Sequence, residues 1–299
     1  MNPSILLTGA GGQVAWEIER RAAATGVSVR AVSRLDLDIT DSKAVYDLVA
    51  AAAPQVIINA AAYTAVDKAE TDKDRAFAVN RDGPAHLAAA CVAHGIPLVH
   101  VSTDYVFDGT KNGPYKEDDP TMPLGVYGAS KLAGEAAVRA LLDRHVIVRT
   151  AWVYGVHGHN FVKTMLRLSA ERDVLRVVAD QRGSPTFAGD LANALLVVAR
   201  RLTDRTVSGE AYGTFHYAGG GAVTWHGFAQ KITDLAAATL ARRPRVEPIT
   251  TAEYPTPAKR PANSVLDCSK ISRIHGIMQR PWEDALREML TSTLSAVPT

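Results

Sequence analysis

Short apolar runs alternate with longer alanine-rich segments through the first half of the chain. Most of the apolar runs are nearly continuous, which is typical of strands that are covered on both faces. The longer segments have helical length and contain many residues that favour helices. We predict strands at 5–7, 27–32, 56–58, 98–101 and 146–148, separated by helices at 13–25, 42–53, 76–94 and 129–142.

This repeated order of strand, helix and strand predicts an α/β fold, a Rossmann-type doubly wound parallel sheet with helices on both faces. The regular alternation ends near residue 155. Beyond it we expect a helix at 189–201, a strand at 215–217, a helix capped by Thr224 that runs to Ala238, and a closing helix at 282–294 after Pro281. The proline-rich stretch 244–261 is predicted to be mostly loop.

We therefore predict two domains. The first, a dinucleotide-binding Rossmann domain, takes residues 1–155 together with about 186–218. The second is a smaller C-terminal α/β cap that binds the substrate, formed by about 156–185 and 219–299.

Composition excludes several other classes of protein. Hydrophobic residues make up 47% of the 299 residues and charged residues 21%, as in soluble globular proteins. The net charge of +2 gives no reason to expect a nucleic acid or an anionic membrane as partner. No uninterrupted apolar run reaches about 18 residues, and residues 1–4 do not begin a signal peptide. Two distant cysteines, Cys91 and Cys268, predict no disulfide framework, so we expect a cytoplasmic protein.

A glycine-rich loop follows the first predicted strand and opens the first predicted helix. It reads Thr-Gly-Ala-Gly-Gly-Gln-Val-Ala over residues 8–15. Glycines at this turn let backbone amides approach a pyrophosphate, and the N-terminus of the following helix favours an anion. Gly9, Gly12 and, at the third position of the pattern, Ala15 predict a dinucleotide cofactor.

The end of the second strand indicates which dinucleotide is bound. A carboxylate there suits the ribose hydroxyls of NAD, and a cation suits the extra phosphate of NADP. Ser33 and Arg34 favour NADPH, whereas Asp36 and Asp38 close behind them leave NADH open.

Candidate catalytic residues lie at the end of the fourth strand and on the helix after it. Tyr127 and Lys131 are four residues apart and share one helix face, and Thr103 ends the strand. We expect Tyr127 to protonate a carbonyl oxygen as a hydride arrives. Lys131 is expected to lower the pKa of Tyr127 and to hold the cofactor ribose, while Thr103 donates a second hydrogen bond to the developing oxyanion.

Several stretches of the chain resemble the dTDP-4-dehydrorhamnose reductase family of extended short-chain dehydrogenases/reductases. The matching stretches are 8–13, 59–70, 101–109, 127–131, 149–155, 180–186 and 260–264. The resemblance implies reduction of the C4 ketone of dTDP-4-dehydro-L-rhamnose to dTDP-L-rhamnose, the final step of dTDP-rhamnose biosynthesis. It implies cofactor contacts at Gly12, Gln13, Val14, Asp38, Ile39, Ala62, Tyr63 and Thr64. Thr103, Asp104 and Trp152 would face the sugar nucleotide, and Arg260 would meet its pyrophosphate.

Some members of this family hold magnesium between subunits through carboxylates. Glu17 matches one such position and Asp190 is a candidate for another, but the C-terminal stretch 290–293 offers no third carboxylate. His157 and His159 flank Gly158 with no third ligand in view. We therefore predict no metal site.

The sequence does not fix the hexulose or its nucleotide carrier, so a reductase of another deoxysugar nucleotide is one alternative. Three functions other than a reductase are also weighed. A sugar-nucleotide 4,6-dehydratase would have a glutamate directly after Asp104, where this chain has Tyr105. An epimerase would share the glycine loop and the Tyr127–Lys131 pair but would retain its cofactor. A non-catalytic regulatory subunit would have no need of Thr103, Tyr127 and Lys131 together. For the assembly, a homodimer is the commonest default.

Overall fold

The computed structural model describes residues 4–240 and 242–294. Its centre is a six-stranded sheet in which every neighbouring pair of strands is parallel. Across the sheet the strands are β2 (Ser28–Val32), β1 (Ser4–Thr8), β3 (Val56–Asn59), β4 (Leu98–Thr103), β5 (His145–Thr150) and β10 (Gly213–His216). The predicted α/β fold and each of its predicted strands are confirmed.

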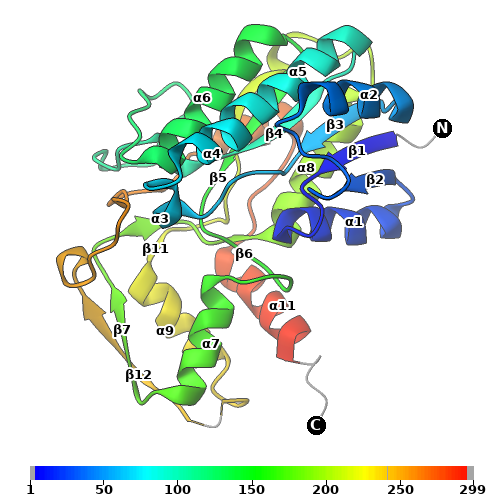
Figure 1. Ribbon diagram of the computed structural model, residues 1–299. Coiled ribbons are helices and arrows are strands. Elements are labelled where there is room, and N and C mark those ends of the chain that lie inside the picture. Colours follow the sequence, from blue (N-terminus) through cyan, green and yellow to red (C-terminus); the bar gives the residue numbers. More distant parts are fainter. Residues whose placement is uncertain (1–3, 241, 295–299) are drawn as a thin grey trace.

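Helices cover both faces of this sheet (Figure 1). Alternate strand residues divide between the two sides: Leu7 packs in the same core cluster as Ile18 of α1, and Leu6 in the same cluster as Val45 of α2. One face carries α1 (Gln13–Thr25) and α8 (Ala188–Leu202), and the other carries α2 (Ser42–Ala52), α5 (Gly83–His94) and α6 (Val126–Leu141). We call these elements and the sheet the sheet region.

The helix predicted at 76–94 is interrupted in its first turns. The chain forms α4 (Lys73–Phe77), then a π-helical turn (Ala78–Asp82), and only then α5. Pro84 has no amide hydrogen to donate to the preceding turn, so the regular α-helical bond at this point cannot form. The wider turn contains Asn80, whose side chain is buried.

A second, smaller group of elements lies below the sheet in Figure 1. Strand β7 (Val174–Val178) pairs in parallel with β12 (Arg245–Ile249), and three helices pack beside them: α7 (Phe161–Glu171), α9 (Trp225–Leu235) and α11 (Trp282–Leu294). We call this group the small region. Its core is a separate cluster that includes Phe228 and Trp282.

The expectation of loop over 244–261 is wrong in part, because this stretch contains β12 and a 3₁₀ turn at Thr251–Glu253. Pro248 lies within β12 and cannot donate to a ladder, yet β12 has a neighbour on one side only in its two-stranded sheet. The predicted division into two domains stays a prediction.

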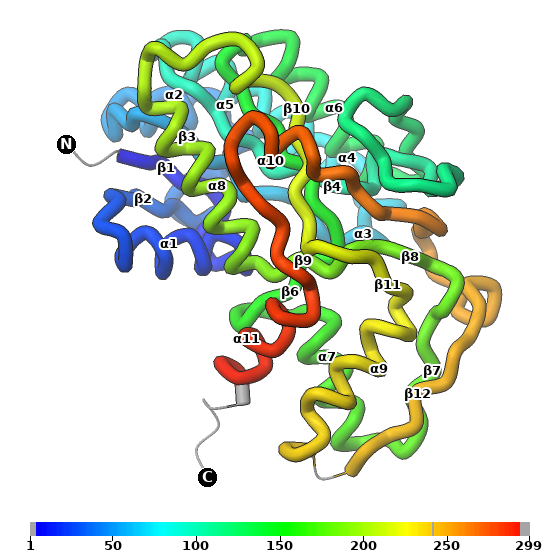
Figure 2. The backbone as a smooth tube through the Cα atoms, turned by 180° about the vertical axis from the view of Figure 1, so that it is seen from behind, coloured from blue at the N-terminus to red at the C-terminus, as the bar shows by residue number. Residues whose placement is uncertain are grey.

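Short elements connect the two regions, as the view from behind shows (Figure 2). They include two small pairs, β6 (Val153–Tyr154) with β9 (Thr186–Phe187) and β8 (Arg182–Gly183) with β11 (Val223–Thr224). Helix α10 (Ser269–His275) packs beside β10 of the sheet. The remaining elements are α3 (Val66–Ala69) and 3₁₀ turns at Asp104–Val106 and Gly209–Ala211. Among the described residues, no helix is both long and apolar enough to cross a membrane.

Candidate functional site

A cavity of about 830 Å³ opens at the carboxyl ends of β1, β3, β4 and β5. The chain leaves β1 toward β2 on one side, while β3 lies on the other side of β1, so the cavity lies where the strand order reverses. Open α/β sheets bind their ligands at this point. Most residues predicted for the cofactor or the substrate line it: Gly9, Gly12, Gln13, Val14, Arg34, Asp38, Ile39, Ala62, Tyr63, Thr64, Thr103, Asp104, Tyr127, Lys131 and Trp152.

The glycine loop forms one wall of the cavity. Gly9 has a φ of +86°, and a Cβ atom there would lie 2.6 Å from the amide nitrogen of Ala61, so only glycine fits. Helix α1 begins at Gln13, and no side chain caps its N-terminus at Gly12. The backbone amides of this first turn therefore have no side-chain acceptor and are suited to a phosphate group.

The loop 155–160 lies against the glycine loop, a contact that the sequence did not predict. His157 Nε2 lies 3.1 Å from the carbonyl oxygen of Gly11, and its ring stacks on Trp16. Asn160 donates to Gln13 Oε1 at 3.0 Å. His157 is thus a contact of the glycine loop.

Asp38 lies beyond β2, at the other end of the cavity, between two arginines. Arg75 donates to Asp38 at 3.1 Å, and Arg34 Nε lies 3.7 Å from the same carboxylate oxygen. Burial opposes ionisation of Asp38, but hydrogen bonds from Thr40 and Arg75 outweigh it and lower its pKa to about 2. Ser33 does not line the cavity, since its amide and hydroxyl both donate to Asp36.

Arg75 is a cavity residue that the sequence did not reveal. It comes from α4, far along the chain from β2, so no local pattern connects it with Asp38. Together the carboxylate and the two guanidinium groups can meet either ribose hydroxyls or a ribose phosphate.

The segment after β3 is held in place by the π-helical turn. Asn80 accepts a hydrogen bond from the amide of Tyr63 at 2.8 Å and donates to the carbonyl oxygen of Tyr63 at 3.1 Å. It also donates to Ser130 Oγ on α6 at 3.0 Å. Asn80 therefore ties the Tyr63 segment of the cavity wall to the helix that carries Tyr127.

Tyr127 and Lys131 line the cavity from one face of α6, near Thr103 at the end of β4. Burial raises the pKa of Tyr127 to about 12, although the neighbouring Thr103 hydroxyl partly opposes the rise. The Nζ atom of Lys131 donates to the carbonyl oxygen of Val101, at 2.7 Å. The predicted lowering of the tyrosine pKa by Lys131 is therefore wrong, because burial of the phenol dominates.

A chain of buried polar side chains runs behind Lys131. The hydroxyl of Thr8 and the amide of Ala61 both donate to Asn59 Oδ1, so Asn59 Nδ2 must donate to Nδ1 of His100, 3.0 Å away. The other ring nitrogen of a neutral His100 then carries the hydrogen and faces Lys131 Nζ at 3.4 Å.

That arrangement gives Lys131 no acceptor on the His100 side. Burial is the main influence on both groups: it lowers the pKa of Lys131 to about 8 and the pKa of His100 well below its usual value. The remaining N–H donors of Lys131 are consequently available to a ligand in the cavity. A histidine inside an otherwise apolar strand was the sequence signal for this chain, and our prediction missed it.

Asp104 is a buried acid in the cavity wall. Burial raises the pKa of Asp104 to about 6, and hydrogen bonds from Ser264 and Thr103 only partly oppose the rise. Thr103 donates its hydroxyl to Asp104 Oδ1 at 3.0 Å. Arg260, by contrast, is not among the lining residues, because it forms two hydrogen bonds with Asp67 of α3, at 2.6 and 2.8 Å.

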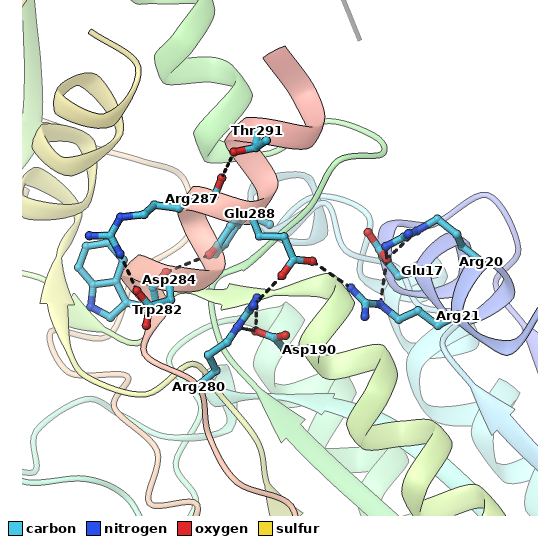
Figure 3. A network of polar contacts seen from close by, with 11 residues as sticks. Glu17, Arg20, Arg21, Asp190, Arg280, Trp282, Asp284, Arg287, Glu288 and Thr291 are labelled. Atoms are coloured by element: carbon cyan, nitrogen blue, oxygen red, sulfur yellow. Dashed lines mark hydrogen bonds and ion pairs between the residues drawn. The ribbon is translucent and has the colours of Figure 1, made fainter. Parts of the chain in front are cut away.

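The carboxylates considered for magnesium belong to a network of arginines (Figure 3). Glu17 is buried and accepts from Arg21 at 3.1 Å, while Asp190 accepts from Arg280 at 3.1 Å. Glu288 of α11, which the sequence did not single out, lies 2.6 Å from Arg280 and 3.6 Å from Arg21.

Guanidinium groups thus lie between the three carboxylates. Within residues 4–240 and 242–294, no three acidic, histidine or cysteine side chains are grouped as metal ligands. The residues of this network fit arginine pairing and do not fit a magnesium ion.

Comparison with known proteins agrees with these observations. Residues 1–295 match the family described as RmlD substrate binding domain. A dTDP-4-dehydrorhamnose reductase of Aggregatibacter actinomycetemcomitans is 46% identical over 290 residues, which is 95% of this chain and 97% of the relative.

Two solved structures are also similar over almost the whole chain. One is a dTDP-4-dehydrorhamnose reductase from Clostridium acetobutylicum, with a TM-score of 0.90 and 42% identity over 97% of this chain and 99% of that one. The other, from Bacillus anthracis in complex with NADP, has a TM-score of 0.89 and 37% identity over 98% of this chain and 100% of that one. The chain therefore belongs to the dTDP-4-dehydrorhamnose reductase family, as its motifs predicted.

Proposed function

We propose that this protein reduces the C4 ketone of dTDP-4-dehydro-L-rhamnose to dTDP-L-rhamnose. NADPH is the proposed hydride donor, and NADH is the alternative that Asp38 leaves open. The observation that carries the proposal is one continuous cavity that joins the glycine loop to Tyr127 and Lys131. The names of the relatives, including one solved with NADP, supply the sugar nucleotide and the cofactor.

The residues present fit a bound dinucleotide. The glycine loop would hold the pyrophosphate of the dinucleotide, through Gly9, Gly12, Gln13 and Val14. Asp38, with Arg34 and Arg75, would hold its adenosine ribose. The part of the dinucleotide between these two sites would contact Ala62, Tyr63 and Thr64. Bound there, the reduced nicotinamide supplies a hydride. In the proposed division of the chain, 1–155 and about 186–218 bind this cofactor, and the remaining residues cover the sugar nucleotide.

Tyr127 would supply the proton of the reaction. The ketone carbon would gain the hydride with its two electrons as the C=O π bond breaks, and the oxygen would take the proton from Tyr127 Oη. The O–H bond of Tyr127 breaks in this step, and the resulting tyrosinate takes a proton back from solvent. With a pKa of about 12, Tyr127 is protonated at neutral pH, and the alkoxide that it protonates is far more basic. A lowered pKa is therefore not needed for the acid role.

Thr103 and Lys131 would act beside it. The single hydroxyl hydrogen of Thr103 is donated to Asp104, so donation to the sugar oxygen requires this hydroxyl to rotate. Lys131 is held by Val101, and its free donors would hold the nicotinamide ribose. Thr103, Asp104 and Trp152 are the proposed sugar contacts. Arg260 would reach the pyrophosphate only after leaving Asp67.

The proposal is tested by following NADPH oxidation with dTDP-4-dehydro-L-rhamnose and identifying the product by NMR. We expect turnover by the wild-type protein and a fall of about 10²- to 10⁴-fold in kcat for Tyr127→Phe, with the affinity for NADPH retained. An unchanged kcat in Tyr127→Phe would show that Tyr127 is not the proton donor. Turnover only with a different keto-sugar nucleotide would show that dTDP-4-dehydro-L-rhamnose is not the substrate.

A further inference from the structure

We propose that Trp225 and Gly183 are positioning residues that hold Trp152 as a rigid platform for the sugar ring of the substrate. The inference rests on the proposed function and deepens it, since it assigns part of the substrate specificity to residues outside the cavity wall. Neither Trp225 nor Gly183 lines the cavity, whereas Trp152 does.

Trp152 has a strained backbone. Its φ is +49°, in the left-handed region, which a bulky side chain rarely adopts. It lies two residues after the end of β5, at the edge of the sheet where Thr150 also lines the cavity. Such strain persists only where the surrounding structure holds the residue in place, and it occurs preferentially at ligand sites.

Trp225 is one of the contacts that hold Trp152. The two indole rings are stacked, with centroids 3.5 Å apart and planes 7° from parallel. Trp225 is itself packed against Phe161, at 4.6 Å between centroids, and against Phe228 in the core of the small region. The stack therefore places one indole on the cavity and the other behind it, fixed to the small region.

Gly183 is the second contact. A Cβ atom at this position would lie between 2.4 and 2.7 Å from three atoms of the Trp152 indole, closer than carbon atoms approach. Any other residue would have to push the ring away. The glycine is needed here for close approach, since its φ is not in the left-handed region.

The pairing of β8 with β11 positions both Gly183 and Trp225 against Trp152. Strand β8 (Arg182–Gly183) pairs antiparallel with β11 (Val223–Thr224), and Gly183 lies opposite Val223. Helix α9 begins at the next residue, Trp225, and its N-cap Thr224 accepts from the amide of Gly227. The position of the Trp152 ring is thus fixed by a two-stranded antiparallel pair outside the main sheet.

A rigid indole suits the substrate class. A 6-deoxyhexose presents C–H groups and a methyl group on its ring, and these apolar groups pack on an aromatic face. Because Trp152 is held before the sugar binds, little conformational entropy is lost on binding. The platform therefore acts on the sugar nucleotide and not on the dinucleotide.

The test compares Trp225→Leu, Trp225→Phe and Gly183→Ala with the wild-type protein in the same NADPH oxidation assay. We expect KM for the sugar nucleotide to rise about 3- to 10-fold in Trp225→Leu and Gly183→Ala, and Trp225→Phe to restore most of the affinity. The dissociation constant for NADPH should stay within a factor of about two in all three. Loss of the tryptophan exciton signal in far-ultraviolet circular dichroism should accompany Trp225→Leu.

Trp282→Leu is the matched control, because Trp282 packs on Phe228 in the same cluster and is not stacked on Trp152. It should lower the melting temperature without changing KM. If Trp225→Leu does not fold, the KM values of Gly183→Ala and Trp225→Phe test the proposal. An unchanged KM in folded Gly183→Ala or Trp225→Leu would contradict the positioning role of these residues. An equal rise of KM in Trp282→Leu would contradict it as well. Absence of turnover in the wild-type protein would overturn the proposed function instead.

Discussion

The sheet region and the small region are stabilised by different kinds of interior. Charged side chains are buried inside the sheet region, where Lys131, Glu135 and Arg149 are almost fully covered. The core of the small region is a cluster of aromatic rings, and its buried polar side chains, such as Ser169 and Thr233, are neutral. The comparison indicates that buried charged groups and their ion pairs are part of the interior of the sheet region, whereas aromatic packing holds the interior of the small region together.

The largest expected difference between the regions concerns ion pairs. Arg149 of β5 binds Glu135 of α6 through two hydrogen bonds, of 2.9 and 2.7 Å, and Ser102 donates to the same carboxylate at 2.6 Å. Burial opposes ionisation of Glu135, but these partners outweigh it, so its pKa stays below its usual value. Arg149→Met would leave a buried carboxylate without its main partner, at a cost of about 3–5 kcal/mol in the free energy of unfolding.

The matched variant in the small region is Arg176→Met. Arg176 of β7 pairs with Glu253, and both side chains are about half exposed. We expect Arg176→Met to cost less than about 1 kcal/mol. Urea unfolding of both variants measures the contrast, and similar losses would contradict it.

The next effect concerns the pH dependence of stability. Burial raises the pKa of Asp104 to about 6 in the folded protein, against 3.8 for a free side chain. The folded state therefore binds this proton more tightly than the unfolded state. The resulting stabilisation is fully present below pH 3.8 and is lost as the pH rises through 6, by roughly 3 kcal/mol at most.

Asp104→Asn removes this dependence, so the wild-type protein should lose stability relative to the variant between pH 4 and pH 7. Asp180, which follows β7, is the matched residue of the small region. Burial opposes ionisation of Asp180, but the hydrogen bonds from Thr251 together outweigh burial and lower the pKa of Asp180, so Asp180→Asn should change the slope in the opposite direction. Parallel pH curves for wild type and Asp104→Asn would show that Asp104 titrates normally.

The two regions also differ in how far the sequence predicted them. The helix at 13–25 was predicted with its observed bounds, because its glycine loop, its length and its C-terminal Gly26 are all local signals. Strand β12 was missed, because its stability comes from pairing with β7, distant in the sequence, and its proline suggested a loop. Local patterns determine the sheet region more completely than the small region.

The candidate site divides in the same way. Spacing on one helix placed Tyr127 and Lys131 together, but it gave no measure of burial, and burial decides that the pKa of Tyr127 rises. Arg75, His100 and Trp225 lie far in sequence from the residues that they contact. Such partners are brought together only by tertiary packing. The histidine in an apolar strand marks His100 as unusual, but nothing local in the sequence pairs it with Lys131.

The smallest expected effect lies at the contact between the two regions, in the network of Figure 3. Glu288 is 42% exposed, lies 3.6 Å from Arg21 of α1 and 2.6 Å from Arg280. Exposed pairs of this kind contribute little, so Glu288→Gln should cost less than about 1 kcal/mol, and the cost should shrink in high salt. If a magnesium ion joined these carboxylates, millimolar MgCl₂ would raise the melting temperature of the wild-type protein and not that of Glu288→Gln. We expect no rise beyond that given by NaCl of equal ionic strength, because Arg21 and Arg280 already neutralise the carboxylates; a magnesium-specific rise would show that the arginines yield to the metal.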